Sequence, residues 1–305
     1  MGEWLKGKVA VITGSGQGIG RAIALAMAKE GARVVTNNRR PGTPGGDAET
    51  TAKEIIDMGG QAVPFFADIS KFDVAEKLIQ TAVDKFGRLD ILVNNATVYP
   101  GYPEPWEMTE EQWDSCLDVG LKGSFNCTRH ACVLMKEQRW GRILNATSGA
   151  WLGTITFSNY GAAKAGIVGL TRSVARDMAR FGVTCNAFVP GAATRGTTKE
   201  ILKPWRKRRY EAGTITKEQS ERNLYMPPPE TVPPFLIYLC TDEAADINGQ
   251  VFHINKGRIA LYSTPKDENP IVKEEGLWTV EELVDLVPKI VLKGYNNPTP
   301  FLPVK

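Results

Sequence analysis

A run of glycines between a buried strand and a helix, close to the start of this chain, constrains its fold more than any other feature. The strand is Val9 to Ile12, four apolar residues without a charge, as is typical of a strand inside a sheet. Glycine lets the backbone turn tightly, and the N–H groups at a helix N-terminus attract phosphate. We therefore predict a nucleotide site, rather than a plain tight turn, at Thr13-Gly14-Ser15-Gly16-Gln17-Gly18-Ile19-Gly20.

Segments typical of strands and helices alternate along the chain of 305 residues, without an internal repeat. Such alternation implies right-handed crossovers and a parallel sheet. We expect the longest helices near residues 109–138 and 159–181. Strands are expected near residues 8–13, 33–37, 61–66, 89–93, 141–147, 183–189 and 250–254.

A tyrosine and a lysine, Tyr160 and Lys164, stand one turn apart in the helix expected over residues 159–181. That spacing puts both side chains on one helix face, where an ammonium close to a phenol favours its ionised form. Tyr160, with an ordinary pKa of about 10, can then act as a general acid or base near neutral pH. Alone, such a pair is most often a solvated surface pair. Together with the glycine run, it indicates oxidation or reduction of a carbon–oxygen bond with a nicotinamide cofactor.

Further motifs follow in a fixed order: Asp68 after the third expected strand, Asn94-Asn95-Ala96 after the fourth, Ser148 after the fifth and Pro190-Gly191 after the sixth. With these motifs, about the first 255 residues resemble the short-chain dehydrogenase/reductase family. The resemblance implies a single Rossmann-type, doubly wound α/β domain with a seven-stranded parallel sheet over residues 1–256, and a C-terminal extension over residues 257–305. It also implies bound NAD or NADP and hydride transfer to or from a carbonyl carbon.

The resemblance implies roles for individual residues. Tyr160 donates or accepts the proton, Lys164 lowers the pKa of Tyr160 and binds the nicotinamide ribose, and Ser148 orients the substrate carbonyl. Tyr160 and Lys164 thus contact the cofactor as well. The other residues implied to bind the cofactor are Gly14, Ser15, Gln17, Gly18, Ile19, Gly20, Asp68, Ile69, Asn95, Ala96, Pro190, Gly191, Ala193 and Thr194.

Three departures from the family's pattern matter. Thr97 stands where a glycine usually follows the Asn-Asn-Ala motif, and its branched side chain narrows the backbone options of that turn. Gly120 stands where an asparagine usually kinks the helix and supports a water-mediated proton relay to the lysine; glycine can kink a helix but offers no amide. The segment before the tyrosine is one residue short, so counting forward from the strand selects Ser148 and counting back selects Thr147. We choose Ser148, because strand register fixes the face that a side chain occupies.

The end of the second expected strand bears on the choice of cofactor. A carboxylate there hydrogen-bonds the ribose hydroxyls of NAD and repels a 2′-phosphate. Here Asn38 occupies that place, and Arg39 and Arg40 follow it. Guanidinium groups match the geometry of phosphate. We therefore favour NADP(H) over NAD(H), with a solvated basic turn as the alternative interpretation.

Residues 183–195, 229–240 and 248–252 carry a closer resemblance, to the dehydrogenase domain of the peroxisomal type-two multifunctional enzyme and its bacterial single-domain relatives. That branch oxidises 3-hydroxyacyl-CoA and also departs from asparagine at the position of Gly120. The substrate implied is a ketone or secondary alcohol: a 3-oxoacyl or 3-hydroxyacyl-CoA, or a cyclic or steroid-like ketone. Gly120 and Thr97 leave an alternative from another class, a catalytically weak, nucleotide-binding partner subunit of a hetero-oligomer.

Composition argues against several other classes of protein. A net charge of +3 is too small to indicate nucleic-acid binding, and no apolar run approaches the ~20 residues that span a bilayer. The start of the chain lacks a basic-then-apolar signal segment. The five cysteines form no CxxC pair and indicate reduced thiols in the cytoplasm, and neither histidine has partners at metal-ligand spacing, so we expect no metal. We expect a homodimer or homotetramer.

Two regions lie outside these motifs. Residues 195–228 are polar and basic, and in this family the segment after the sixth strand covers the substrate. Its basic cluster, residues 203–209, either meets CoA phosphates or is a solvated helix face. The extension contains one expected helix near residues 276–287, for which Thr279 and Glu282 form a capping box. We expect the apolar face of that helix to pack on this subunit or on a neighbouring one.

Overall fold

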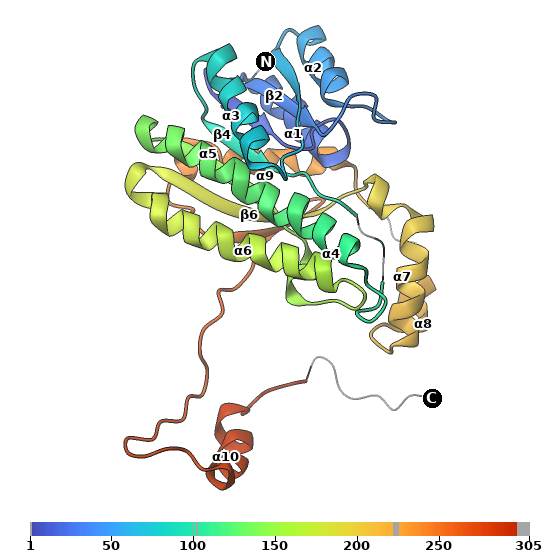
Figure 1. Cartoon of the computed structure of the whole chain (residues 1–305), viewed down its shortest axis with the longest axis vertical. Helices are drawn as coiled ribbons and strands as arrows, with labels where there is room; N and C mark the ends of the chain where they lie inside the picture. Colours follow the sequence, from blue (N-terminus) through green and yellow to red (C-terminus); the bar gives the residue numbers. More distant parts are fainter. Residues whose placement is uncertain (1, 100, 102, 222–225, 298–305) are drawn as a thin grey trace. The chain divides into compact units, whose positions relative to one another are not determined.

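The computed structural model describes residues 2–99, 101, 103–221 and 226–297. Residues 222–225 of the segment expected to cover the substrate, and residues 298–305 of the extension, lie outside this description. The described chain forms one sheet of eight strands in the order β3-β2-β1-β4-β5-β6-β7-β8 (Figure 1). The strands are β1 (Val9–Ile12), β2 (Arg33–Asn38), β3 (Gln61–Phe66), β4 (Ile91–Asn94), β5 (Gly141–Ala146), β6 (Val183–Gly191), β7 (Val251–Asn255) and β8 (Arg258–Leu261).

Seven of these strands are the predicted ones, and all seven are parallel. The eighth, β8, runs antiparallel to β7, with Asn255 opposite Arg258. The two-residue turn between them places Lys256 at φ +55°. β8 is absent from the predicted strands because this short edge strand has no buried face, so burial imposes no strand pattern on its sequence. The expected seven-stranded sheet therefore gains one antiparallel edge strand.

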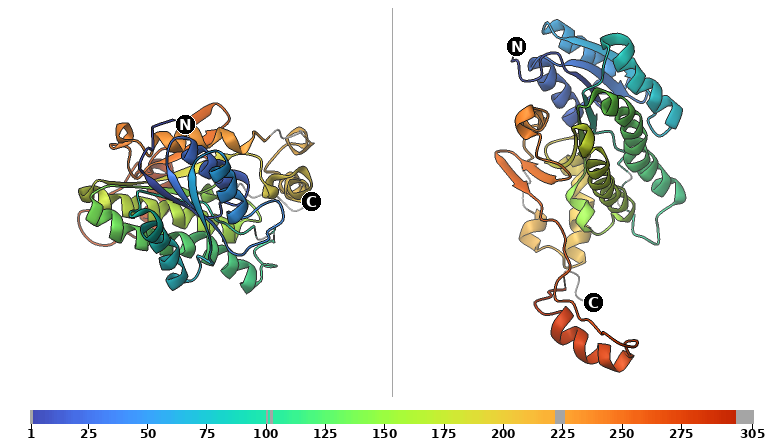
Figure 2. Two further views of the ribbon diagram at one scale, coloured as in Figure 1. Left: turned by 90° about the horizontal axis from the view of Figure 1, so that it is seen from above. Right: turned by 90° about the vertical axis from the view of Figure 1, so that its left-hand side faces the viewer.

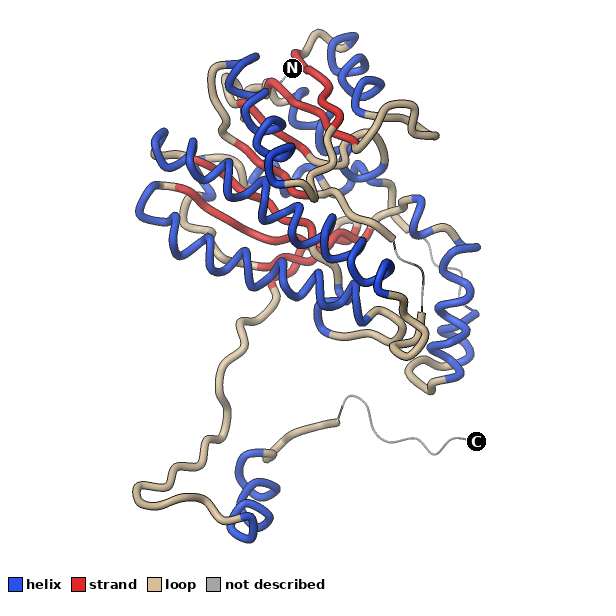
Figure 3. The backbone as a smooth tube through the Cα atoms, in the orientation of Figure 1, coloured by secondary structure: helices blue, strands red, loops and turns tan. Residues whose placement is uncertain are grey.

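Helices lie on both sides of the sheet (Figure 2) and connect successive strands (Figure 3). The helix expected over residues 109–138 is divided, because a π-helical turn, Asp118–Lys122, interrupts it. No helix in the described part of the chain has the length and apolar character needed to span a membrane. The helices are α1 (Gly18–Lys29), α2 (Ala48–Asp57), α3 (Phe72–Phe86), α4 (Glu110–Leu117), α5 (Gly123–Gln138), α6 (Ser158–Met178), α7 (Lys199–Glu211), α8 (Lys217–Glu221), α9 (Pro233–Tyr238) and α10 (Val280–Leu286).

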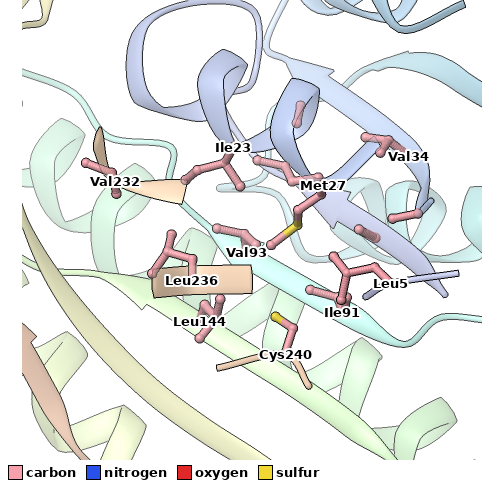
Figure 4. Packing of buried hydrophobic residues seen from close by; sticks show 14 of the residues in the cluster. Leu5, Ile23, Met27, Val34, Ile91, Val93, Leu144, Val232, Leu236 and Cys240 are labelled. Carbon is pink, nitrogen blue, oxygen red and sulfur yellow. The ribbon is translucent and has the colours of Figure 1, made fainter. Parts of the chain in front are cut away.

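The core lies in two layers because successive residues of each strand point to opposite sides of the sheet. In β1, Ile12 joins a hydrophobic cluster with α1, α2 and α9, while Val11 joins a second cluster with α3, α5 and α6. Figure 4 shows the first cluster, in which Met27 of α1 points toward Val93 of β4. Both faces of the strands are therefore buried, which explains their nearly continuous apolar sequences.

The strand order reverses at β1, which pairs with β2 on one side and β4 on the other. In such sheets, ligands bind outside the carboxyl ends of the strands at this point. The glycine run follows β1 and the Asn-Asn-Ala motif follows β4, and Thr13 N donates to the Val93 carbonyl at 3.0 Å. The fold thus brings the two motifs predicted to bind the cofactor together at one edge of the sheet.

The chain divides into two compact units, Met1–Lys207 with Arg222–Tyr262, and Arg208–Glu221 with Ser263–Lys305. The first unit holds the whole sheet. In the second, α10 begins after Thr279, whose Oγ1 accepts from Glu282 N at 3.2 Å while Thr279 N donates to Glu282 Oε2 at 2.8 Å. The predicted capping box is therefore confirmed.

Candidate active site

Tyr160 and Lys164 lie one turn apart near the start of α6. Tyr160 is half-buried, whereas only 2% of Lys164 is exposed. Lys164 Nζ lies 5.4 Å from the centre of the Tyr160 ring and donates to the carbonyl of Ala146, at the end of β5, at 2.9 Å. That bond ties α6 to the carboxyl edge of the sheet and fixes the ammonium group beside the phenol.

The hydroxyls of Ser148 and Thr147, the two candidates for the catalytic role, have different partners. Thr147 is buried, and its Oγ1 donates to the carbonyl of Lys164 at 2.9 Å. Ser148 hydrogen-bonds the Tyr160 side chain and also accepts from Ala150 N at 3.3 Å. Consecutive residues of extended chain face opposite ways, which separates the two hydroxyls. The structure therefore places Ser148, and not Thr147, beside the phenol.

Burial dominates the ionisation of these side chains. Removal from water raises the pKa of Tyr160 to about 12, and the hydrogen bond with Ser148 acts in the opposite direction. Removal from water also lowers the pKa of Lys164 to about 8, partly offset by the Cys116 thiol. The sequence led us to expect a lowered Tyr160 pKa; the shift is upward because burial disfavours both charged forms. In this chain Tyr160 is a protonated phenol at neutral pH, suited to donate a proton.

The glycine run packs directly on the loop after β4. Gly14, with φ +64°, leaves no room for a side chain, because a Cβ there would lie 2.9 Å from Ala96 Cα. A Cβ on Gly20 would lie 2.3 Å from the Gly14 carbonyl oxygen. Asn95 Nδ2 donates to the carbonyls of Thr13 and Gly14 at 3.1 and 3.2 Å. The first turn of α1 carries no acidic residue to neutralise its positive end, so this turn fits a dinucleotide pyrophosphate.

Residues after β6 reach the same edge of the sheet. Pro190 and Gly191 end β6 itself. Thr194 lies beside the glycine run, where its Cγ2 would be 3.9 Å from a Cβ on Gly18. Ala193 N donates to the Pro227 carbonyl at 2.7 Å. The structure thus brings Thr194 next to the glycine run, while Pro190 and Gly191 lie at the carboxyl end of β6.

Other predicted cofactor residues have side chains engaged within the protein. Ser15 Oγ donates to the carbonyl that ends β1 at 2.8 Å, and Gln17 donates to the loop after β2. Ile19 packs against the first hydrophobic cluster, and Ile69 is buried. Asp68 Oδ1 accepts from the backbone and hydroxyl of the serine two places on, at 3.1 and 2.7 Å. Most of these residues can offer a cofactor their backbone or an apolar surface, while Asp68 keeps a second carboxylate oxygen that the described hydrogen bonds do not use.

The end of β2 carries the residues predicted to discriminate between cofactors. Asn38 is half-buried, and its Oδ1 is buried without a hydrogen-bond partner among the described residues. Arg39 and Arg40 follow in an exposed loop. An acceptor lacking a partner, beside exposed guanidinium groups, fits a ribose hydroxyl and a phosphate.

Sequence patterns give no weight to Asn159 and Phe157, yet both contact Tyr160. Asn159 is fully buried; its Oδ1 accepts from Tyr160 N at 2.7 Å, and its Nδ2 donates to the Gln112 carbonyl of α4 at 2.9 Å. The Phe157 ring lies 5.4 Å from the Tyr160 ring and 5.8 Å from that of Trp205. Their closeness to Tyr160 in the sequence is the sign that could have drawn attention to them.

The two unusual residues, Gly120 and Thr97, fit the structure without backbone strain. Gly120 is buried in the π-helical turn, and a Cβ there would lie 3.7 Å from the Ala163 Cβ, an ordinary contact distance. Its carbonyl accepts from Ser124 Oγ at 2.7 Å. Thr97 is exposed and does not adopt a left-handed conformation. The π-helical turn, rather than a side chain at position 120, interrupts this helix.

Comparison with known proteins identifies the family. Residues 8–205 match the family model described as short chain dehydrogenase. The chain is 36% identical to a 3-oxoacyl-[acyl-carrier-protein] reductase of Synechocystis sp. over 263 residues, covering 84% of this chain and 98% of that protein. It is 43% identical over 198 residues to peroxisomal multifunctional enzyme type 2 of Drosophila melanogaster, covering 63% of this chain but only 32% of that enzyme.

A solved structure agrees over nearly the whole chain. The crystal structure of a short chain dehydrogenase from Mycobacterium avium matches with a TM-score of 0.80 and 35% identity, covering 98% of this chain and 99% of that one. The predicted family resemblance is thereby confirmed. From the fold, the order of its motifs and these matches, the chain belongs to the short-chain dehydrogenase family and is an NAD(P)-dependent oxidoreductase.

Proposed function

We propose that this protein transfers a hydride between NADPH and a ketone or secondary alcohol. The observation that carries the proposal is the convergence of Ser148, Tyr160 and Lys164 at the carboxyl edge of the sheet. Ser148 bonds the phenol, and Lys164 Nζ lies 5.4 Å from the centre of its ring. Such an arrangement can hold a carbonyl oxygen between two hydroxyl groups and give it a proton.

In the reducing direction, Ser148 orients the substrate by donating to its carbonyl oxygen. Tyr160 then gives its proton to that oxygen as negative charge develops there. The nicotinamide, when bound, supplies the hydride to the carbonyl carbon. Lys164, positively charged below its pKa of about 8, stabilises the phenolate that remains on Tyr160. In the oxidising direction the transfers are reversed, and the phenolate accepts the proton of the alcohol.

The proposed substrate is a 3-oxoacyl or 3-hydroxyacyl-CoA, or else a cyclic or steroid-like ketone. The name of the 3-oxoacyl-[acyl-carrier-protein] reductase from Synechocystis sp. supports a 3-oxoacyl thioester. The Phe157 ring beside Tyr160, with the Trp205 ring packed on Phe157, supports an apolar, flat substrate equally well. Oxidation of NADPH measured against a panel that contains both classes chooses between them.

Replacement of Tyr160 by phenylalanine tests the proposed chemistry. Phenylalanine keeps the ring and its contact with Phe157 but removes the proton, so turnover should fall by about a hundredfold or more. The Kd of NADPH should change little, because the ring still fills the same space. A folded Tyr160→Phe protein that kept more than about a tenth of the wild-type rate would contradict the role of Tyr160.

A second candidate function is that of a catalytically weak partner subunit. The observation that favours it is Gly120, which has no side chain to support a proton relay. It predicts cofactor binding without turnover of any ketone in the panel, by the wild type and by Tyr160→Phe alike. A measurable wild-type rate that is lost in Tyr160→Phe decides for the enzyme.

The proposed cofactor preference depends on the end of β2. NADPH should bind more tightly than NADH, because Arg39 and Arg40 are exposed beside Asn38 and no carboxylate stands in its place. Arg39→Ala combined with Asn38→Asp should reverse the preference, since it removes a cation and adds an acceptor for the ribose hydroxyls. Fluorescence titration of both cofactors measures the two Kd values. Equal wild-type affinities would mean that the arginines belong to a solvated turn.

We also propose that the protein works in the cytoplasm as a homodimer or homotetramer. All five cysteines are free thiols, as expected in a reducing compartment. The mass of the assembly in solution, measured by light scattering, tests the oligomeric state.

A further inference from the structure

The loop from Arg39 to Asp47, which follows β2, packs on the glycine run. Gln17 makes a central contact, because its Nε2 donates to the carbonyl oxygens of Pro44 and Gly46 at 2.9 and 3.0 Å. Gln17 directly precedes α1, yet its side chain makes no capping bond to that helix. One amide group therefore ties the middle of the glycine run to the far end of the loop.

Close backbone contacts at Gly16 support the same arrangement. A Cβ on Gly16 would lie 2.1 Å from Asn38 Oδ1 and 2.5 Å from Asp47 Cα, so residues at both ends of the loop crowd one point. A Cβ on Gly46, which has φ +119°, would lie 2.7 Å from the Gly16 carbonyl oxygen. A side chain at either glycine would push the loop away from the run.

The loop's own hydrogen bonds, as far as the structure describes them, involve its backbone and the side chains of Thr43 and Asp47 rather than the arginine side chains. Thr43 Oγ1 donates to the Arg40 carbonyl at 3.2 Å, and Gly42 N donates to Asp47 Oδ2 at 2.8 Å. Glycine loses more conformational freedom than any other residue when it is ordered, and the loop contains three: Gly42, Gly45 and Gly46. The two hydrogen bonds from Gln17 therefore add to the contacts that hold this glycine-rich loop against the glycine run.

We infer that Gln17 is a positioning residue that holds Arg39 and Arg40 toward the 2′ end of the cofactor, and so sets how strongly the protein distinguishes NADPH from NADH. Its side-chain amide acts through the loop, to which it is bonded, and not on the cofactor. Exposed arginines on a free loop still attract phosphate, but arginines held in place bind it at a lower entropic cost. This inference rests on the proposed nicotinamide chemistry, but it concerns the ratio of two affinities and not which cofactor is preferred.

The test compares NADPH and NADH binding to the wild type and to Gln17→Leu by titration of cofactor fluorescence. Leucine has similar bulk and removes both donated hydrogen bonds. We expect the Kd of NADPH to rise about tenfold relative to that of NADH. Gln80→Leu is the matched control: Gln80 lies on α3, donates to Asp84 at 2.9 Å and takes no part in the loop. It should leave both Kd values unchanged.

Limited proteolysis reports the position of the loop without any cofactor. Trypsin cuts after Arg39 but not after Arg40, because Pro41 follows, so a single cleavage measures how accessible the loop is. Cleavage after Arg39 should be faster in Gln17→Leu than in the wild type or in Gln80→Leu. If Gln17→Leu does not fold, Gln17→Met, with an unbranched side chain, replaces it.

Equal losses of affinity for both cofactors would overturn the inference, since Gln17 would then support the pyrophosphate turn as a whole. Unchanged Kd values, whatever the rate of cleavage, would overturn it too. A wild-type preference for NADH would refute only the proposed choice of cofactor. The change in the ratio of the two Kd values would still decide the role of Gln17.

Discussion

Ser148 and Thr147 are neighbours in the chain, but their hydroxyl groups serve different purposes. Ser148→Ala removes the donor beside Tyr160 and should lower kcat about a hundredfold, as loss of one donor to a developing oxyanion does. Thr147→Val removes the bond to the Lys164 carbonyl and should instead lower the free energy of unfolding by about 1–3 kcal/mol, with a smaller effect on kcat. Urea unfolding and steady-state rates on the same samples separate the two effects. The reverse pattern would make Thr147 the catalytic hydroxyl.

At the scale of single residues, the sequence predicts which residues belong to the site better than it predicts which atoms they contact. Tyr160 and Lys164 are recognisable because a spacing of four residues fixes a shared helix face. The partner of the Thr147 hydroxyl, in contrast, depends on how β5 meets α6. Asn159 bonds to Gln112 of another helix, and no local pattern encodes that contact. The upward shift of the Tyr160 pKa likewise follows from burial, which the spacing of motifs does not specify.

At the scale of elements, the π-helical turn between α4 and α5 places Gly120 where a Cβ has room. Gly120→Asn should change the free energy of unfolding by less than about 1 kcal/mol, because a Cβ meets Ala163 at an ordinary distance and both residues are weak helix formers. If the backbone carbonyl and a water carry protons to Lys164, activity should stay equal or rise. Steady-state rates on the best ketone of the panel measure this.

Two outcomes of that experiment would have other meanings. A large loss of activity in a well-folded Gly120→Asn protein would count against the relay and assign the space beside Ala163 to the substrate. No rate before or after the substitution is what the partner-subunit alternative expects. Since Ser124 already bonds the Gly120 carbonyl, Ser124→Ala is a useful companion, because it frees that oxygen for water.

The elements that the sequence predicts are those with a strong and repeated pattern. Each of the seven parallel strands has a run of apolar or β-branched residues, and α1 and α6 follow recognisable motifs. The π-helical turn could not be predicted from the sequence. A glycine allows the backbone to form i→i+5 hydrogen bonds in place of i→i+4 ones, but it does not require them. β8 could not be predicted either, because an edge strand of four residues has no buried face to impose a pattern.

At the scale of the whole molecule, burial of Lys164 makes stability depend on pH. Its folded-state pKa of about 8 lies below the ordinary value of 10.5, so between these values the unfolded chain holds a proton that the folded chain has lost. We therefore compare the free energy of unfolding of the wild type with that of Lys164→Met between pH 8 and 9.5. Over this range the wild type should become more stable relative to the variant, by at most about 1.4 kcal/mol per pH unit. Tyr160, with its raised pKa, opposes this trend only above pH 10. Urea unfolding of both proteins measures the difference, and parallel curves would contradict it.

The parallel sheet itself is predictable from alternation, since each crossover has one allowed hand. The grouping of distant segments is not. Residues 208–221 form a compact unit with residues from 263 onward, although β7 and β8 separate them in sequence. Neither periodicity nor capping residues in the sequence indicate this division of the chain.

The π-helical turn also sets the rotational phase of the helix that follows it. One residue more or less turns every later side chain by about 100° around the helix axis. In α5, Cys127, Ala131 and Met135 share the buried face, while Phe125 and Val133 are exposed. In a regular α-helix such a change would carry this buried stripe toward solvent. A π-helical turn holds about one residue more than an α-helical turn, so loss of one residue at Asp118–Lys122 can convert the turn to α-helix without rotating α5. The turn is therefore the place in this long helix where the packing of the next 16 residues tolerates a change in the length of the chain.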